Sequence, residues 1–552
     1  MLKKLFKIIA WIFGVIIVLI VALLVYVAIV ARVDPPVPTS MAAMDGKVTE
    51  PSPGLFKIGN NWFRKSESGF YELYIEGDPF ERGAAYGKLT KDLLYSQEKA
   101  FVDQLHTLVP SNTWINILRV YVGWFNRDLD DNIPAENRLE IFGVAESAPH
   151  DFDYIASAYQ RMLNYHAAHD IGHALQNMSL VGCTSFATWD ESSEDSSLII
   201  GRNFDFYVGD DFARNKIIAF YNPSEGNQFM MVTFAGMTGV LSGMNNAGLS
   251  LTLNAAKSDI PSGSATPVSI VAREILQYAT TIEEAYKIAQ RRKTFVAESF
   301  LIGSAMDGKA AVIEKSPERC ELFYGNDHSL VCTNHFQSDS LGNTELNKEH
   351  MRTSPSVYRY QRVEELLARD GKNSVEKTAA ILRNQLGLND ADIGMGNEKL
   401  VNQMVAHHGI IFQPEKRLVW ISTAPNQMGK FVCYDLNKIF SQGMAENKEV
   451  YEADLGIPAD TFIQTVQYRD FLKYSKYRFP FFPKDDLLPD SVLKWNPSSY
   501  HSYMLAGDYY FDKKEYSKAV PYYENGLTRE VASIQERDYM TSRIKECGEK
   551  QR

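Results

Sequence analysis

A single cysteine stands out among the residues that could do chemistry. Cys183 lies in "VGCTSFATWD" (181–190), and "GRNFDF" (201–206) follows with an arginine and an aspartate. A cysteine reacts as its thiolate, and with an unperturbed pKa of about 8.5 it needs a base or a positive neighbour. The first question that the sequence raises is therefore which group activates Cys183.

Two kinds of base are available to this thiol. If the Gly182–Cys183 bond were cut, Cys183 would carry an α-amine with a pKa of about 7.7 to 8.0, placed by covalent geometry beside its own thiol. A conventional Cys/His pair is the alternative, although no histidine directly adjoins Cys183 in the sequence. The histidines considered are His166, His169, His173, His335, His407 and His408.

Five motifs in a fixed order carry a family resemblance. "GCTSF" and "GRNFDF" are followed by "GMNNAGL" (243–249), "CTNHF" (332–336) and "YRYQR" (358–362). Together they resemble the N-terminal-nucleophile (Ntn) hydrolases, specifically the isopenicillin N acyltransferase branch with its autoproteolytic cysteine enzymes. The choloylglycine hydrolases, with bile salt hydrolases and penicillin V acylase, are more distant relatives. "EGDPFERGAAYG" (76–87) resembles the start of that branch's pro-region, so the likeness covers roughly residues 70 to 440.

The resemblance implies a role for each residue around the thiol. Cys183 would be the nucleophile and would first attack the carbonyl of Gly182 to release its own amine. Glycine suits that position because it lets the thiol approach closely. Arg202 would keep positive charge near the thiolate, and Asp205 would hold the α-amine. Without the resemblance, Cys183 could be an inert buried thiol and Arg202 with Asp205 an ordinary ion pair.

Three further residues come from the later motifs. The resemblance implies that Asn245 donates to the developing oxyanion, that Asn334 holds the substrate or the nucleophile, and that Arg359 is a second, structural cation. Asn245 could equally belong to a plain hairpin turn, and Asn334 could simply end a strand. Arg352 and Arg362 compete with Arg359 for its role.

Composition narrows the function classes. The chain has 552 residues, a formal net charge of −11 and no long basic run, which argues against a nucleic-acid partner. Its five cysteines contain no CxxC pattern, which argues against a zinc site. No other metal and no cofactor is expected. Cys320 and Cys332 are interpreted as reduced, although a disulfide between them stays open.

The N-terminus predicts a membrane anchor. Residues 8–31 carry no charge and are long enough to cross a hydrocarbon core of about 30 Å as one helix. Three lysines, Lys3, Lys4 and Lys7, precede the span, and Arg32 with Asp34 follows it. The positive-inside bias predicts a cytoplasmic N-terminus and a catalytic part in the periplasm or outside the cell.

The patterns along the chain predict an α+β protein. Short β-rich runs follow residue 180, two helices come next, and strands resume after 298, as in a layered structure with helices outside antiparallel sheets. The resemblance implies the four-layer αββα Ntn-hydrolase sandwich. Residues 501–527 have the spacing of one tetratricopeptide-like hairpin. The expected division is 1–33 transmembrane anchor, 34–54 linker, 55–182 mainly helical pro-region, 183–445 catalytic core, 446–495 irregular connection and 496–552 helical hairpin.

The sequence therefore predicts a membrane-anchored, self-cleaving cysteine amidohydrolase or acyltransferase. It would act on a linear N-acyl amide of a small molecule through a thioester on Cys183. Two rivals stay open: a Cys/His hydrolase without self-cleavage, and a non-enzymatic anchored binding protein that contacts another protein through its C-terminal hairpin.

Overall fold

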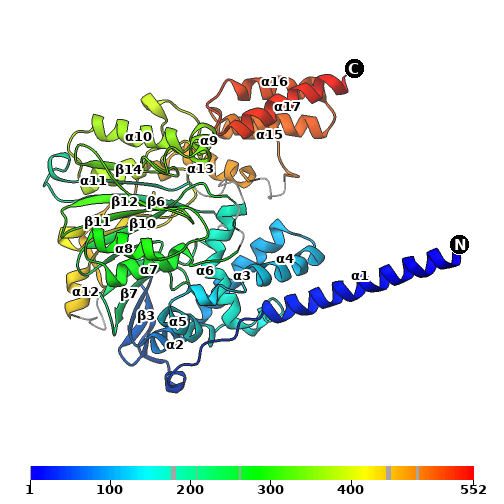
Figure 1. Ribbon diagram of the computed structural model, residues 1–552. Helices are drawn as coiled ribbons and strands as arrows, with labels where there is room; N and C mark the ends of the chain where they lie inside the picture. The colour runs from blue at the N-terminus through cyan, green and yellow to red at the C-terminus, as the bar shows by residue number, and fades with distance from the viewer. Residues whose placement is uncertain are drawn as a thin grey trace.

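The computed structural model describes residues 2–175, 182–207, 209, 211–259, 261, 263–442, 449–479 and 484–551. Its first element is a long helix, α1 (Leu2–Val30), that projects from the body of the molecule (Figure 1). Lys4–Val27 within it has a mean hydropathy of 3.3 and none of it is buried, so the helix is apolar and long enough to cross a membrane. The helix thus forms where the sequence predicts the span.

Within the described residues, eleven strands form the larger sheet, in the order β1-β2-β3-β4-β7-β8-β9-β10-β11-β12-β13. All neighbours are antiparallel except β4 and β7, which are parallel over seven residue pairs from Tyr71–Ile217 to Gly77–Pro223. The strands are β1 (Thr49–Ser52), β2 (Leu55–Ile58), β3 (Asn61–Lys65), β4 (Tyr71–Gly77), β7 (Ile217–Pro223), β8 (Phe229–Thr233), β9 (Ser242–Asn245), β10 (Leu249–Ala255), β11 (Glu298–Ser304), β12 (Lys309–Lys315) and β13 (Cys320–Tyr324).

The second sheet has seven strands, in the order β14-β5-β6-β15-β16-β17-β18, all antiparallel. They are β5 (Thr184–Thr188), β6 (Ile199–Asp205), β14 (Ser329–Cys332), β15 (Ala406–Gln413), β16 (Leu418–Ser422), β17 (Phe431–Asp435) and β18 (Tyr451–Ile457).

The two sheets pack face to face through alternate side chains. On β12, Ala310 and Val312 join one buried cluster with Ile200 of β6, whereas Ala311 and Ile313 join a different cluster on the opposite face. Successive side chains of a strand point to opposite faces, so a sheet with both faces buried needs apolar residues at consecutive positions. This explains the continuous apolar runs in the strand sequences.

Helices cover the outer faces of both sheets. On the larger sheet, α7 (Val268–Tyr278) contacts β9 and β10, and α8 (Ile282–Arg291), which begins with the capping box of Thr281 and Glu284, contacts β12. On the smaller sheet lie α10 (Ser356–Arg369) and α11 (Val375–Leu382). The remaining helices near these layers are α9 (Glu345–Thr353) and α12 (Leu436–Gln442). The chain is therefore a mixed α and β protein, as expected.

The segment before Cys183 is helical in large part. Its helices are α2 (Pro79–Leu89), α3 (Lys91–Leu108), α4 (Asn112–Phe125), α5 (Ala135–Ala145) and α6 (Ala158–Leu175). Helices α2 and α5 approach so closely that a Cβ on Gly83 would lie 2.0 Å from the carbonyl oxygen of Glu140, which explains a glycine in the 76–87 motif. This segment also supplies β1 to β4, which extend the larger sheet, so it is built into the core.

The C-terminal part contains more structure than an irregular connection and a hairpin. Strand β18 and helices α13 (Val466–Tyr474) and α14 (Pro489–Trp495) lie within the expected connection. They are followed by α15 (Tyr500–Asp512), α16 (Tyr516–Leu527) and a third helix, α17 (Ile534–Lys550), which packs on α16. Helices α15 and α16 pack so closely at Gly507 that a Cβ there would lie 2.6 Å from the ring of Tyr523.

Candidate active site

The topology brings Cys183 to one end of the smaller sheet. Cys183 directly precedes β5, and the ladder between β5 and β6 continues past it, because the backbone N–H of Gly182 donates to the carbonyl of Asp205 at 2.9 Å. Asn334 lies two residues after the end of β14, the other neighbour of β5. Because β6 and β14 are both antiparallel to β5, the end of β6, the start of β5 and the end of β14 lie at the same end of the sheet.

Arg202 binds the thiol. Its Nη2 lies 3.6 Å from Sγ of Cys183, and both side chains are buried. The guanidinium also donates to the carbonyls of Leu241, at 3.3 Å, and Leu253, and it packs 4.2 Å from the ring centroid of Phe204. These contacts with the larger sheet fix the positive charge beside the sulfur.

Burial opposes ionisation of this thiol. Desolvation raises the pKa of Cys183 to about 11, while the positive charges of Arg202 and Arg359 act in the opposite direction. The thiol is therefore protonated at neutral pH, and a base would be needed for it to react as a thiolate.

Asp205 carries a buried carboxylate. Neither of its oxygens accepts a hydrogen bond from any residue in the described part of the chain, and burial raises its pKa to about 7. The positive charges of Arg359, Arg478 and Arg202 lower that pKa in part. A buried acceptor of this kind is complementary to a cation with N–H donors, such as an α-ammonium group.

Arg359 lies at the centre of the site. Its Nη1 donates to the carbonyls of Gly182 at 3.0 Å and of Cys183 at 2.6 Å, and its Nη2 donates to Oδ1 of Asn334 at 2.6 Å. Arg352 instead pairs with Glu349 at the surface, and Arg362 pairs with Asp390. Of the three candidate arginines, Arg359 is the one that the structure brings to Cys183.

Asn334 is brought to the same place. Its Nδ2 donates to the carbonyl of Ala255 at 2.9 Å, and its backbone N–H donates to Oγ of Ser356 at 2.8 Å. The residue thus links β10, the N-terminal end of α10 and the guanidinium of Arg359.

Asn245 is not brought to the site, and its expected role as oxyanion donor is corrected. Its Nδ2 donates to the carbonyls of Leu276 at 2.9 Å and Ala279 at 2.7 Å, so both amide hydrogens are already used. Its Oδ1 accepts from the N–H of Leu249, and Gly248 follows with a φ of +79°. The motif forms the β9–β10 hairpin turn, which was the alternative reading.

Two buried amides near the thiol were missed from the sequence. Nε2 of Gln403 donates to the carbonyl of Gly182 at 2.6 Å, and a Cβ on Gly182 would lie 2.4 Å from that nitrogen. Asn254 on β10 accepts from Oγ of Ser185 at 2.6 Å and donates to the carbonyl of Cys332 at 2.9 Å. Neither stands in a motif used above, although Asn254 lies just beyond "GMNNAGL" on the same strand.

The histidines have other partners. His166 bonds to Thr238 at 2.9 Å, His335 to Ser356 at 2.8 Å, and His408 to Ser242 at 2.9 Å, while His407 bonds to His408. Among the described residues, the one hydrogen bond to Sγ of Cys183 comes from Arg202. The side chains of His169 and His173 lie outside the described residues. The geometry thus gives no support to a Cys/His pair.

The described residues include no group of three or more His, Cys, Asp or Glu that could hold a metal. All five cysteines, including Cys320 and Cys332, are free thiols, which agrees with the interpretation that they are reduced.

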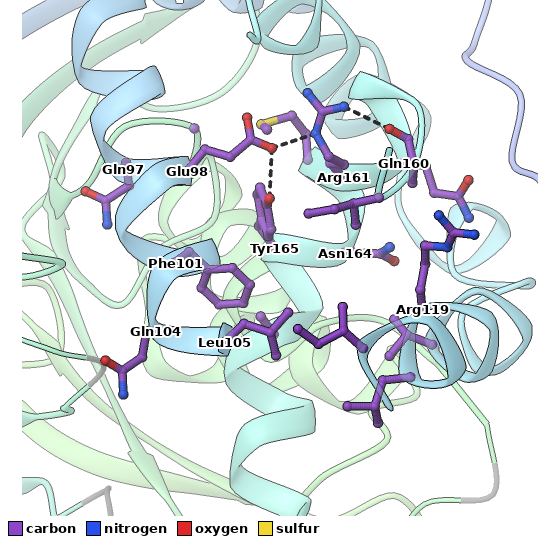
Figure 2. Close-up of a pocket in the computed structure, with 18 of the residues that line it drawn as sticks. Gln97, Glu98, Phe101, Gln104, Leu105, Arg119, Gln160, Arg161, Asn164 and Tyr165 are labelled. Carbon is purple, nitrogen blue, oxygen red and sulfur yellow. Dashed lines mark hydrogen bonds and ion pairs between the residues drawn. The ribbon is translucent and has the colours of Figure 1, made fainter. Parts of the chain in front are cut away.

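A large apolar cavity adjoins the site. Its volume is about 750 Å³, and α3, α4 and α6 line it together with residues near β6 and β8. Figure 2 shows Glu98 of α3 with Arg161 and Tyr165 of α6, which form a buried ion pair of 2.6 Å and a hydrogen bond of 2.8 Å. Because this pair is neutral as a unit and the remaining walls are mostly aliphatic and aromatic, the cavity suits an apolar ligand.

Comparisons with known proteins bear on this site. Residues 190–424 match the family model described as acyl-coenzyme A:6-aminopenicillanic acid acyl-transferase. This stretch, less than half of the chain, contains Arg202, Asp205, Asn334 and Arg359 and begins just after Cys183.

One curated relative is an uncharacterized protein of Archaeoglobus fulgidus, 26% identical over 276 residues, which are 47% of this chain and 45% of the relative. The chain thus spans less than half the length of that relative. Solved structures with partial similarity include a Caenorhabditis elegans N-acylethanolamine-hydrolyzing acid amidase ortholog (19% identity, 42% of this chain and 93% of that one, TM-score 0.30). Another is penicillin V acylase from Agrobacterium tumefaciens (13% identity, 46% and 87%, TM-score 0.31).

The family match confirms the resemblance that the ordered motifs predicted. Residues 190–424 of this chain have the sequence pattern of the acyl-coenzyme A:6-aminopenicillanic acid acyl-transferase family.

Proposed function

We propose that the protein is a membrane-anchored cysteine Ntn enzyme that cuts itself before Cys183 and then acts on a linear N-acyl amide. The observation that carries the proposal is the environment of the Gly182–Cys183 bond. Its carbonyl accepts from Arg359 and Gln403, the adjacent thiol accepts from Arg202, and the carboxylate of Asp205 has no donor among the described residues.

Self-cleavage would begin with attack of the Cys183 sulfur on the carbonyl carbon of Gly182. The S–C bond forms, the C–N bond breaks, and the thiol proton ends on the departing nitrogen. Water then hydrolyses the thioester, which leaves a carboxylate on Gly182 and restores the thiol. Arg359 and Gln403 are placed to stabilise the oxygen as negative charge develops on it.

The new α-amine would supply the missing base. It would take the thiol proton when Cys183 attacks the amide carbonyl of a substrate, and as an ammonium it would pair with Asp205. The resulting acyl-thioester would transfer its acyl group to water or to an amine. We favour hydrolysis, because a catalytic part outside the cytoplasm would not meet acyl-coenzyme A.

The architecture fits this proposal. We propose that the two facing sheets, with helices on both outer faces, are the αββα sandwich of an Ntn hydrolase, and that α1 is a membrane anchor whose N-terminus is cytoplasmic. We further propose that α15 and α16 are a tetratricopeptide-like hairpin that packs on the catalytic part. Tyr500 of α15 donates to Glu398 at 3.3 Å, and Lys399 pairs with Glu530, just after α16, at 2.5 Å.

The intact mass of the detergent-solubilised chain tests the proposal, with wild type beside Cys183→Ala. We expect two fragments in the wild type, the second beginning at Cys183, and one uncut chain in the variant. Cys433→Ala, which changes another buried thiol, is the matched control and should be cut like wild type.

Uncut chains of wild type and both variants would overturn self-cleavage. If the uncut wild type still formed an acyl-thioester with an activated ester, the result would favour a Cys/His hydrolase. If it formed no acyl-thioester, the result would favour a non-enzymatic binding protein.

A further inference from the structure

The inner end of the cavity lies one side chain away from the nucleophile. Phe204 and Leu241 both line the cavity, and the guanidinium of Arg202 packs on the first and donates to the carbonyl of the second. The same guanidinium binds the sulfur of Cys183. A chain that fills the cavity would thus present its carbonyl end toward Cys183.

The outer end of the cavity meets the apolar helix α1. Val27, Ala31 and Arg32 form part of its lining. A Cβ on Gly123 of α4 would lie 3.1 Å from Cβ of Ala31, so the two segments are in direct contact. The mouth of the cavity is therefore next to the end of the helix that would leave the bilayer.

Helix α4 exposes an apolar face beside this mouth. Trp114, Ile117, Val120 and Tyr121 are between 43% and 61% exposed, and the helix contains no acidic residue. A second hollow of about 570 Å³ is lined by three of these side chains, Ile117, Val120 and Tyr121, and by Val27. Tryptophan and tyrosine prefer the interface between lipid and water, and a bilayer that receives α1 would lie against the same face.

From these three observations we infer that the cavity binds the aliphatic acyl chain of a membrane-lipid amide, which enters from the bilayer between α1 and α4. The inference rests on the proposed function, because it supplies the acyl group that Cys183 would accept. The bilayer is favoured over a protein partner because the apolar face of α4 contacts α1, and no residue of the span Lys4–Val27 is buried.

Acylation of Cys183 by p-nitrophenyl esters, from acetate to palmitate, measures the chain preference without knowledge of the natural amine. The ester C–O bond breaks, an S–C bond forms, p-nitrophenolate leaves, and the α-amine takes the thiol proton. Mass spectrometry of the Cys183 fragment reports the product. We expect the specificity constant to rise by up to fourfold per methylene until the cavity is full.

Leu105→Trp fills the cavity from α3 and should lower palmitoylation at least tenfold while acetylation stays within twofold of wild type. Leu527→Trp, at a partly buried leucine of α16, is the control and should change neither. A flat dependence on chain length in wild type, or equal losses for both esters in Leu105→Trp, would overturn the inference. Failure of every ester to acylate Cys183 would overturn the proposed function itself.

The route from the bilayer is tested with palmitoyl ester in phosphatidylcholine vesicles. Ile117→Lys combined with Val120→Lys should slow this reaction at least fivefold and leave acetylation in solution unchanged. Met306→Lys, at a 68% exposed residue in the β11–β12 turn, is the control. Wild-type rates in the double variant would overturn entry beside α4.

Discussion

Gln403 offers a sharp test of the proposed self-cleavage. Its Nε2 donates to the carbonyl of Gly182 at 2.6 Å inside a buried site, so this hydrogen bond strengthens as the oxygen becomes negative during attack. Removal of one such donor costs about 2.7 to 4 kcal/mol of transition-state stabilisation, or roughly 10²- to 10³-fold in rate. Gln403→Glu keeps the shape but replaces the donor with an acceptor, and it should slow cleavage by at least this factor.

The assay follows the disappearance of uncut chain after synthesis in a cell-free system, by gel and by intact mass. Gln413→Glu is the matched control, because both glutamines are 4% exposed and Gln413 instead bonds to Asp195 and Ser197. A thermal unfolding curve shows that the variant is folded. Cleavage of folded Gln403→Glu within threefold of wild type would refute the assignment of this amide to the scissile carbonyl.

Three further changes probe the same region and its support. In the uncut Cys183→Ala background, a pKa of about 7 for Asp205 means that the folded chain binds more protons than the unfolded one between about pH 4 and 7, so stability falls as pH rises through this window. Asp205→Asn should remove this fall in stability and raise the free energy of unfolding at pH 8 by about 4 kcal/mol, as measured by urea unfolding at pH 5 and pH 8. An unchanged pH dependence would contradict the conclusion that burial raises the pKa of Asp205. Gly182→Ala places a Cβ 2.4 Å from Nε2 of Gln403 and should leave most of the chain uncut by intact mass, whereas wild-type cleavage would show that the close approach is unnecessary. Glu140→Gln leaves Arg82 and Arg273 buried without their shared carboxylate and should lower the free energy of unfolding by about 3 to 5 kcal/mol in a denaturant titration; a loss under 1 kcal/mol would mean that these charges are solvated.

Local sequence patterns predicted several of the residues that the structure brings together around Cys183, because these residues lie on strands or at their ends. Arg202 and Asp205 are three apart on β6, so they point to opposite faces: Arg202 reaches the larger sheet, and Asp205 lies on the side of Arg359. A nucleophile at the neighbouring strand's end can be near both. That geometry is readable from sequence once the motifs fix the strand pairing.

The errors have physical reasons. Asn245 stands in a motif that also encodes a hairpin. The side-chain amide of an asparagine can hydrogen-bond to the backbone of a turn as well as to an oxyanion. Gln403 was missed because it reaches Gly182 from 221 positions away, and no local pattern signals such a contact. The segment before Cys183 contains helices α2 to α6, but its strands β1 to β4 join the larger sheet, which was not expected because the pairing between β4 and β7 depends on distant chain segments.

That pairing has a consequence for the enzyme after cleavage. The proposed cut at Gly182 would turn one chain into two subunits, with α1, the proposed anchor, on one and Cys183 on the other, and no peptide bond would then connect Cys183 to α1. The parallel ladder of β4 with β7, and the ion pair of Glu140 with Arg273, would become a subunit interface. Maturation would thus create a heterodimer in which the subunit with Cys183 is held to the subunit with α1 by noncovalent contacts alone, so that a denaturant would separate the two.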